Sequence, residues 1–87
     1  MKNENVKQII QELARQNFNL YPESYPLENG LSTDEATTTA QELAIGYWDN
    51  RNETEVERDE ELNVTKIDYV DWVMAEYESF VQEKIGE

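Results

Sequence analysis

Hydrophobic residues recur at helical spacing near the beginning of the chain. In residues 3–18, apolar side chains lie three or four positions apart, as they do on one face of an amphipathic helix. The members of this face are Val6, Ile9, Ile10, Leu13 and Ala14. Asn3 or Asn5 can cap the start, because an asparagine oxygen accepts from unpaired backbone N–H groups. The pattern predicts a first helix over residues 3–18.

A second helical pattern covers residues 32–48. Ser32 is followed three residues later by Glu35, which is the spacing of a capping box, and Asp34 adds a favourable negative charge near the helix start. One face of this predicted helix consists of Ala36, Ala40, Leu43, Ala44 and Tyr47. Gly46 favours an end of the helix before residue 48.

The longest apolar stripe lies in residues 64–86 and predicts a third helix. Its members are Ile67, Val70, Val73, Met74, Tyr77, Phe80, Val81 and Ile85. Three helices with short connections predict an all-α fold, a small three-helix bundle in a single domain over residues 1–87.

The connection over residues 19–31 contains Pro22, Pro26 and the turn-forming pair Asn29-Gly30. We expect a loop whose apolar side chains pack over the helices, namely Leu20, Tyr21, Tyr25 and Leu27. The alternative is a short hairpin in which residues 20–25 pair past the turn. The prolines disfavour that hairpin, because each of them removes a backbone donor from a strand.

The stretch over residues 49–63, DNRNETEVERDEELN, has only two apolar residues, Val56 and Leu62. Seven carboxylates are opposed by two arginines. The pattern predicts either an acidic loop or a short fourth helix that Asn52 or Thr54 caps. Like charges three and four residues apart weaken an isolated helix, so both structures stay open.

Charge is unevenly distributed along the chain, whose formal net charge is -13. Residues 1–33 hold four acids and three bases, whereas residues 34–87 hold sixteen acids and four bases. Direct binding to nucleic acid is disfavoured, because neutralising phosphates requires lysine and arginine. The favoured partner is a protein with a basic surface.

Several classes of chemistry lack their usual residues. The chain has no cysteine and no histidine, so it has no thiol nucleophile, no disulfide and no imidazole base or metal ligand. Its acids cluster in the most hydrophilic segment, where they are expected to stay solvated and ionised, so catalysis by paired carboxylates is disfavoured. No apolar run reaches the ~20 residues of a membrane helix, and no signal-peptide pattern is seen at the start. We expect a non-enzymatic protein of the cytoplasm.

A calcium-binding loop is one alternative for residues 49–60. Asp49, Val56 and Glu60 match positions 1, 8 and 12 of an EF-hand. Arg51, however, puts a cation at position 3, and Thr54 stands at position 6, where the turn requires glycine. A divalent-cation-binding protein therefore remains an alternative, although two positions of the EF-hand motif do not match.

The third predicted helix has an acidic side opposite its apolar stripe. A helical wheel places Trp72 on this side, four residues after Asp68 and four before Glu76. An exposed indole beside carboxylates would suit the arginines of a partner. Alternatively, the proline-rich loop or residues 49–63 cover Trp72. Tyr47 and Trp48 have the same two interpretations, an aromatic corner beside the acids or side chains of the core.

In its size, its charge and its lack of catalytic residues, the chain resembles the small acidic DNA-mimic inhibitors of bacteriophages and mobile elements, which include anti-CRISPR and anti-restriction proteins. The resemblance implies an inhibitor that blocks a nucleic-acid channel, for instance in a Cas effector, and that acts in the host bacterial cell if a phage encodes it. Carboxylates three and four residues apart on a helix lie ~5–6 Å from one another and can stand in for phosphates. The candidate partner-binding residues are Asp49, Glu53, Glu55, Glu57, Asp59, Glu60, Glu61, Asp68, Asp71, Trp72, Glu76 and Glu83.

This interpretation requires no catalytic residue, cofactor or metal. A second interpretation is a phage or bacterial adaptor or antitoxin that binds its partner through an apolar and aromatic surface. Ionic strength distinguishes the two, because salt weakens binding between opposite charges but not binding between apolar surfaces.

Overall fold

The computed structural model describes residues 2–86, in which four α-helices form most of the fold. The helices are α1 (Lys2–Leu20), α2 (Asp34–Asp49), α3 (Glu53–Glu61) and α4 (Lys66–Ile85). A single 3-10 turn (Pro22–Ser24) and a small antiparallel hairpin, β1 (Leu27–Glu28) and β2 (Leu31–Ser32), connect α1 to α2. The predicted all-α fold is confirmed, and the acidic stretch forms a fourth helix instead of a loop.

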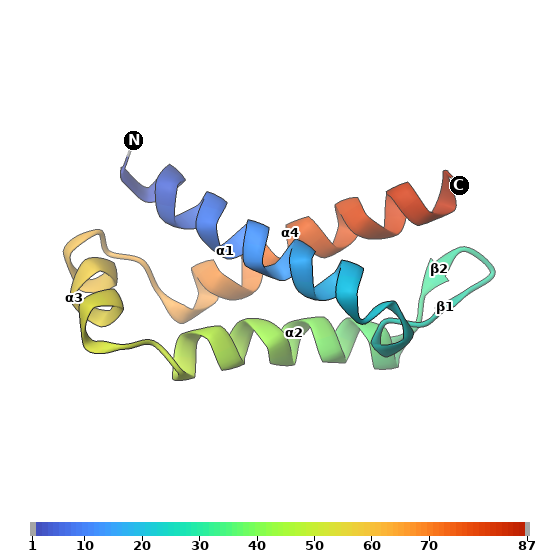
Figure 1. Ribbon diagram of the computed structural model, residues 1–87, viewed down its shortest axis with the longest axis horizontal. Helices are drawn as coiled ribbons and strands as arrows, with labels where there is room; N and C mark the ends of the chain where they lie inside the picture. The colour runs from blue at the N-terminus through green and yellow to red at the C-terminus, as the bar shows by residue number, and fades with distance from the viewer. Residues whose placement is uncertain (1, 87) are drawn as a thin grey trace.

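Helix α4 is the centre of the arrangement, because α1 and α2 both pack against it. Figure 1 shows α1 crossing α4, with α2 running along the other side of the molecule. The short helix α3 lies at one end, beyond the last turn of α2, and the hairpin lies at the opposite end. The result is an elongated molecule of 42 × 23 × 20 Å.

The core is built from one stripe of each long helix. Helix α1 contributes side chains at a spacing of four residues, namely Val6, Ile10, Ala14 and Phe18. Helix α2 contributes three alanines, Ala36, Ala40 and Ala44, whose small side chains let its backbone lie close to α4. Of the face predicted for α1, Ile9 and Leu13 lie outside the core, with 47% and 43% of their surface exposed.

Four aromatic rings fill the core near the hairpin. The ring of Phe18 lies 4.9 Å from that of Tyr25 and 5.3 Å from that of Tyr77, both edge to face, and 5.4 Å from that of Phe80. The hydroxyl of Tyr25 donates to Oδ1 of Asn17. Tyr25 and Leu27 thus pack on the helices as predicted, whereas Leu20 and Tyr21 are exposed.

The turn at Asn29-Gly30 forms as predicted. Both residues have positive φ angles, 53° and 76°, which asparagine and glycine adopt at the lowest cost. The strands on either side are Leu27–Glu28 and Leu31–Ser32. Residues 20–25 do not pair, so the predicted alternative hairpin had the correct turn but the wrong strand.

The start of α2 differs from the prediction by one residue. Thr33, not Ser32, is the N-cap, and its side chain accepts from the backbone N–H of Ala36 at 3.1 Å. Ser32 belongs to β2, and its hydroxyl lies 2.7 Å from the hydroxyl of Tyr77. The capping box of Ser32 with Glu35 is therefore wrong, because Ser32 is used to join the hairpin to α4. Gly46 does not end α2, which continues to Asp49.

The first turn of α4 also presents a different face from the predicted one. Ile67 is 71% exposed, and Ile85 at the other end of the stripe is 49% exposed. Tyr69, which was not predicted in the core, is completely buried there. The cause lies in α3, which brings a carboxylate against the tyrosine hydroxyl.

Candidate functional site

Six of the nine residues of α3 are acids. The helix forms because Asn52 and Glu55 make a complete capping box, as the sequence predicted for Asn52. The Asn52 side chain accepts from the Glu55 N–H at 2.8 Å, and the Glu55 carboxylate accepts from the Asn52 N–H at 3.2 Å. Glu55 is half-buried and its carboxylate is partly used inside the molecule.

Four glutamates of α3 share one solvent-exposed face. Their positions are Glu53, Glu57, Glu60 and Glu61, which are four, seven and eight residues from the first and therefore lie on one side of a helix. Asp49, the last residue of α2, is also exposed. We call these five residues the α3 acidic surface. The segment from residue 49 to residue 65 contains no lysine.

Asp59 is the exception, and its predicted role as an exposed phosphate surrogate is wrong. Its side chain is completely buried. Oδ2 accepts from the Tyr69 hydroxyl at 2.6 Å and from Arg51 Nη1 at 3.1 Å. Oδ1 accepts from Arg58 Nε at 3.0 Å. A buried carboxylate must be paired in this way, since an unpaired one would be too costly to remove from water.

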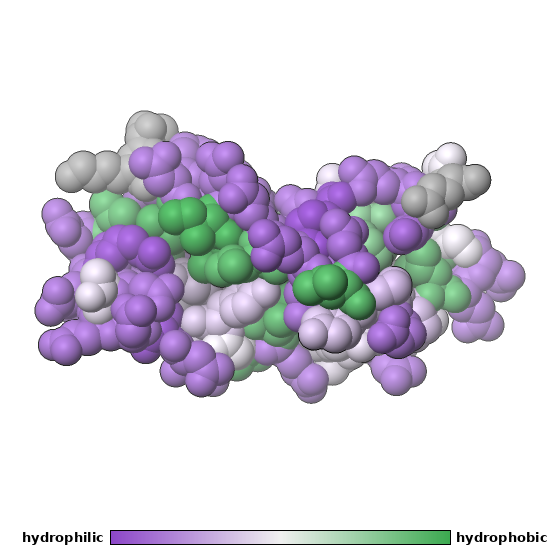
Figure 2. Space-filling model, viewed as in Figure 1, coloured by the Kyte–Doolittle hydropathy of each residue, from purple (hydrophilic) through white to green (hydrophobic). Residues whose placement is uncertain are grey.

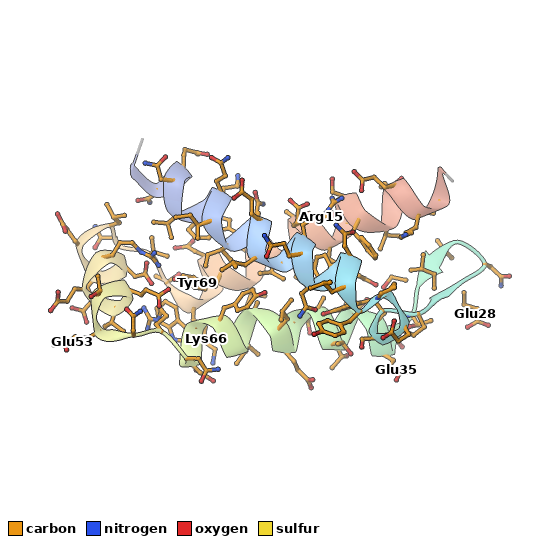
Figure 3. The ribbon with its side chains drawn as sticks, viewed as in Figure 1. Arg15, Glu28, Glu35, Glu53, Lys66 and Tyr69 are labelled. Atoms are coloured by element: carbon orange, nitrogen blue, oxygen red, sulfur yellow. The ribbon has the colours of Figure 1, made fainter. Side chains whose placement is uncertain are left out.

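The groups around Asp59 connect three helices. Arg51 donates from Nε to the carbonyl of Trp48 at 2.8 Å, and its guanidinium lies 3.3 Å from the centre of the Trp48 ring. Arg58 donates from Nη2 to the Tyr69 hydroxyl at 3.0 Å. We call Trp48, Arg51, Arg58, Asp59 and Tyr69 the Asp59 cluster. It holds α3 between the end of α2 and the start of α4 (Figure 3).

The Asp59 cluster shifts the ionisation of its members. Burial by itself raises the pKa of Asp59, but the hydrogen bonds from Arg58, Tyr69 and Arg51 outweigh burial and hold the pKa below its usual value. Burial, followed by the hydrogen bond to the Asp59 carboxylate and its charge, raises the pKa of Tyr69 to about 12. Asp59 is therefore ionised and Tyr69 protonated throughout the neutral range.

Alkaline pH is expected to weaken the fold through Tyr69. Since its pKa is raised from 10.0 to about 12, Tyr69 contributes stability that is fully present below pH 10 and is lost as the pH rises toward 12. The loss should approach roughly 3 kcal/mol, at ~1.4 kcal/mol for each pKa unit. Urea unfolding measured at intervals across this range tests it. The Tyr69→Phe variant should show a flatter pH dependence than the wild type, and equal slopes for the two proteins would contradict this assignment.

The acidic side of α4 is partly engaged by α1. Arg15 reaches across from α1 and forms ion pairs with Glu76, at 2.7 Å, and with Glu83. Gln11 donates from Nε2 to the carbonyl of Trp72 at 3.1 Å. Trp72 is half-buried and its ring lies 6.0 Å from that of Tyr69. The predicted open recognition face with Trp72 at its centre is therefore only partly open, because Trp72 packs against the core and Glu76 and Glu83 pair with Arg15.

The remaining predicted residues have separate positions. Asp68 is half-buried and forms a capping box with Thr65, whose N–H donates to Asp68 Oδ2 at 2.8 Å. Asp71 is exposed. Tyr47 and Trp48 are both half-buried against the core, and the Trp48 ring packs edge to face at 5.3 Å from Tyr69. These two aromatic side chains thus belong with the core.

Every arginine of the chain is used in an ion pair within the molecule. Arg15 pairs with Glu76 and Glu83, and Arg51 and Arg58 both pair with Asp59. Beyond these pairs, the sequence has seventeen acids and four lysines. The cations that form the strongest bidentate contacts are turned inward, while the α3 acidic surface points to solvent.

The segment that resembles an EF-hand does not form a calcium loop. Its fifth residue, Glu53, is already the start of α3, so the rest of the segment is helical. Over residues 2–86, no group of three or more possible ligands among histidine, cysteine and acidic side chains is arranged to hold a metal ion. The same range contains no helix that is both long enough and apolar enough to span a bilayer.

Comparison of the chain with protein-family models, with characterised proteins and with solved structures finds no match in any of the three.

Proposed function

We propose that this protein is a non-enzymatic inhibitor that mimics the charge of a nucleic acid. Its α3 acidic surface would occupy the basic DNA- or RNA-binding surface of a target protein, for instance a Cas effector, which would make it an anti-CRISPR protein. The observation that carries the proposal is the separation of charge in the fold. All three arginines pair internally, and four glutamates of α3 point outward from one helical face.

The average charge density of these carboxylates along the helix axis is close to that of phosphates along one DNA strand. From Glu53 to Glu61 the helix rises ~12 Å, so four carboxylates give one charge per ~3–4 Å of axis. One strand of duplex DNA carries one phosphate per ~3.4 Å. A basic groove that attracts phosphates at this charge density would therefore also attract α3.

The Asp59 cluster supports the proposal through preorganisation. A disordered acidic segment would lose conformational freedom on binding, which opposes association. Here α3 is folded and fixed between α2 and α4 before any partner arrives, because the Asp59 cluster anchors its inner face. More of the electrostatic attraction is then available for binding.

A competition experiment tests the proposal. Proteins from a bacterial lysate are captured on the immobilised chain at low salt, and excess duplex DNA is then added. We expect the DNA to displace the specific partner, and raising the salt from ~50 to ~200 mM to weaken binding at least about tenfold, since screening acts on opposite charges. A partner that resists both DNA and salt would contradict charge mimicry and would favour the apolar adaptor instead.

A further inference from the structure

Helix α1 carries a second apolar stripe outside the core. Ile9, Leu13 and Leu20 are 47%, 43% and 69% exposed. On a helix of 3.6 residues per turn, these three side chains lie within about 40° of one another. Isolated exposed apolar residues are common and need no explanation. Three that line up on one helical face form a patch, and apolar patches often mark interaction sites. Figure 2 shows hydrophobic surface over α1 on the face turned to the viewer.

The spacing of the stripe is typical of paired helices. Together with the exposed Gln16, the three residues occupy positions 9, 13, 16 and 20, at intervals of four, three and four. This alternation marks the seam of a two-helix contact, and a single polar residue such as Gln16 within it can fix the register. Across residues 3–20, the other exposed positions of α1 are all polar: Asn3, Glu4, Asn5, Gln8, Glu12, Gln16 and Asn19.

The charge of α1 also sets it apart from the rest of the protein. Its 19 residues contain two acids and three bases, whereas residues 21–87 contain eighteen acids and four bases. Two copies that met through α2, α3 or α4 would bring carboxylates against carboxylates. The contact between two α1 helices avoids that repulsion, and both copies then offer the same apolar seam.

We propose that this stripe binds a second copy of the chain, so that two α1 helices pair in a symmetric dimer. The antiparallel arrangement fits best. The start of α1 and helix α3 lie toward the same end of the molecule (Figure 1), so antiparallel pairing puts the two α3 helices at opposite ends of the dimer. The dimer would present one α3 acidic surface at each end, and the proposal holds whether or not that surface mimics nucleic acid.

Salt gives this contact a distinctive signature. The two copies both carry a net charge of -13, and their residual repulsion is screened as salt is added. The dimer should therefore become stronger with salt, which is the reverse of the response expected for a basic partner at α3. The opposite signs keep a failure of the dimer distinguishable from a failure of charge mimicry.

Sedimentation velocity over a range of protein concentrations, at about 50 and about 500 mM salt, tests the dimer. We expect a monomer–dimer equilibrium that shifts toward the dimer at high salt. The double variant Ile9→Gln with Leu13→Gln keeps the charge and a good helix former at both positions, and should raise the dissociation constant at least tenfold.

Leu31→Gln is the matched control, because Leu31 is 68% exposed in β2 and outside the stripe. It should leave the dimer unchanged. Circular dichroism should show the same helix content in all three proteins. A wild type that stays monomeric at every concentration and salt would overturn the proposal, as would a control that dissociates the dimer as strongly as the double variant.

Discussion

Replacing Asp59 by alanine is expected to lower the free energy of unfolding by about 3–5 kcal/mol, the range found when one partner of a buried ion pair is removed. The side chain has no exposed surface, and it accepts hydrogen bonds from Arg51, Arg58 and Tyr69. Its loss would leave two guanidinium groups and a buried hydroxyl without their shared acceptor. A domain of this size has only ~5–15 kcal/mol to lose, so the change is large.

Urea unfolding followed by circular dichroism measures this loss, and the fluorescence of Trp48, which lies under the Arg51 guanidinium, reports on the cluster itself. Two controls frame the result. Tyr69→Phe removes the two hydrogen bonds of the hydroxyl, to Asp59 and from Arg58, with little change of shape, and should cost about 1–3 kcal/mol. Glu61→Ala alters an exposed acid of the same helix and should change stability by less than ~0.5 kcal/mol. An Asp59→Ala variant as stable as Glu61→Ala would show that the cluster does not hold α3.

The helical spacing of Asp59 relative to apolar residues indicates its burial, although its charge suggests exposure. Val56 and Leu62 are the only apolar residues of the stretch, and each is three positions from Asp59, so all three lie on one helical face. The glutamates at 53, 57, 60 and 61 lie on the opposite face. A wheel drawn for a helix would thus have separated the buried acid from the exposed ones. The total charge of the segment does not distinguish Asp59 from the exposed glutamates.

The helices themselves followed from local patterns, because apolar periodicity and capping residues act within a few positions of each other. The wheel of α4 was also correct in grouping Trp72, Glu76 and Glu83 on one side. The wheel could not show that α1 packs beside these residues. Arg15 is more than sixty positions away, and its ion pairs depend on how α1 crosses α4, which no local pattern specifies. The way α1 crosses α4 also decides which face of α1 is buried, so periodicity alone wrongly predicted Ile9 and Leu13 in the core.

The structure leaves fewer of the predicted acids available to bind a partner. Asp59, Glu76 and Glu83 have internal partners, and Glu55 and Asp68 cap helices. Of the acids predicted to bind a partner, those that remain exposed without such a role are the α3 acidic surface and Asp71. Five of these six come from a segment without lysine, at one end of an elongated molecule. If these candidate acids bind the partner, the contact lies at that end of the molecule, and charge changes at the two ends should have different effects.

Inverting two charges of the α3 acidic surface is expected to abolish binding to a basic partner. Glu57→Lys with Glu60→Lys replaces two exposed carboxylates by two cations on the same helical face. Each former attraction becomes a repulsion, and close charge pairs at interfaces are coupled by ~1.5–7 kcal/mol. A loss of about 4 kcal/mol corresponds to roughly 1,000-fold in the dissociation constant. Calorimetry with the partner isolated by DNA displacement measures the loss.

The chain offers a matched control at its other end. Glu23→Lys with Glu28→Lys makes the same change in net charge at exposed positions of the 3-10 turn and β1. Glu28 lies near the end of the molecule opposite Glu53 (Figure 3). If α3 is the mimic, the control should keep most of the affinity and lose only the part that long-range attraction contributes. Equal losses from the two double variants would mean that the partner responds to total charge, and that the geometry of α3 has no special part in binding.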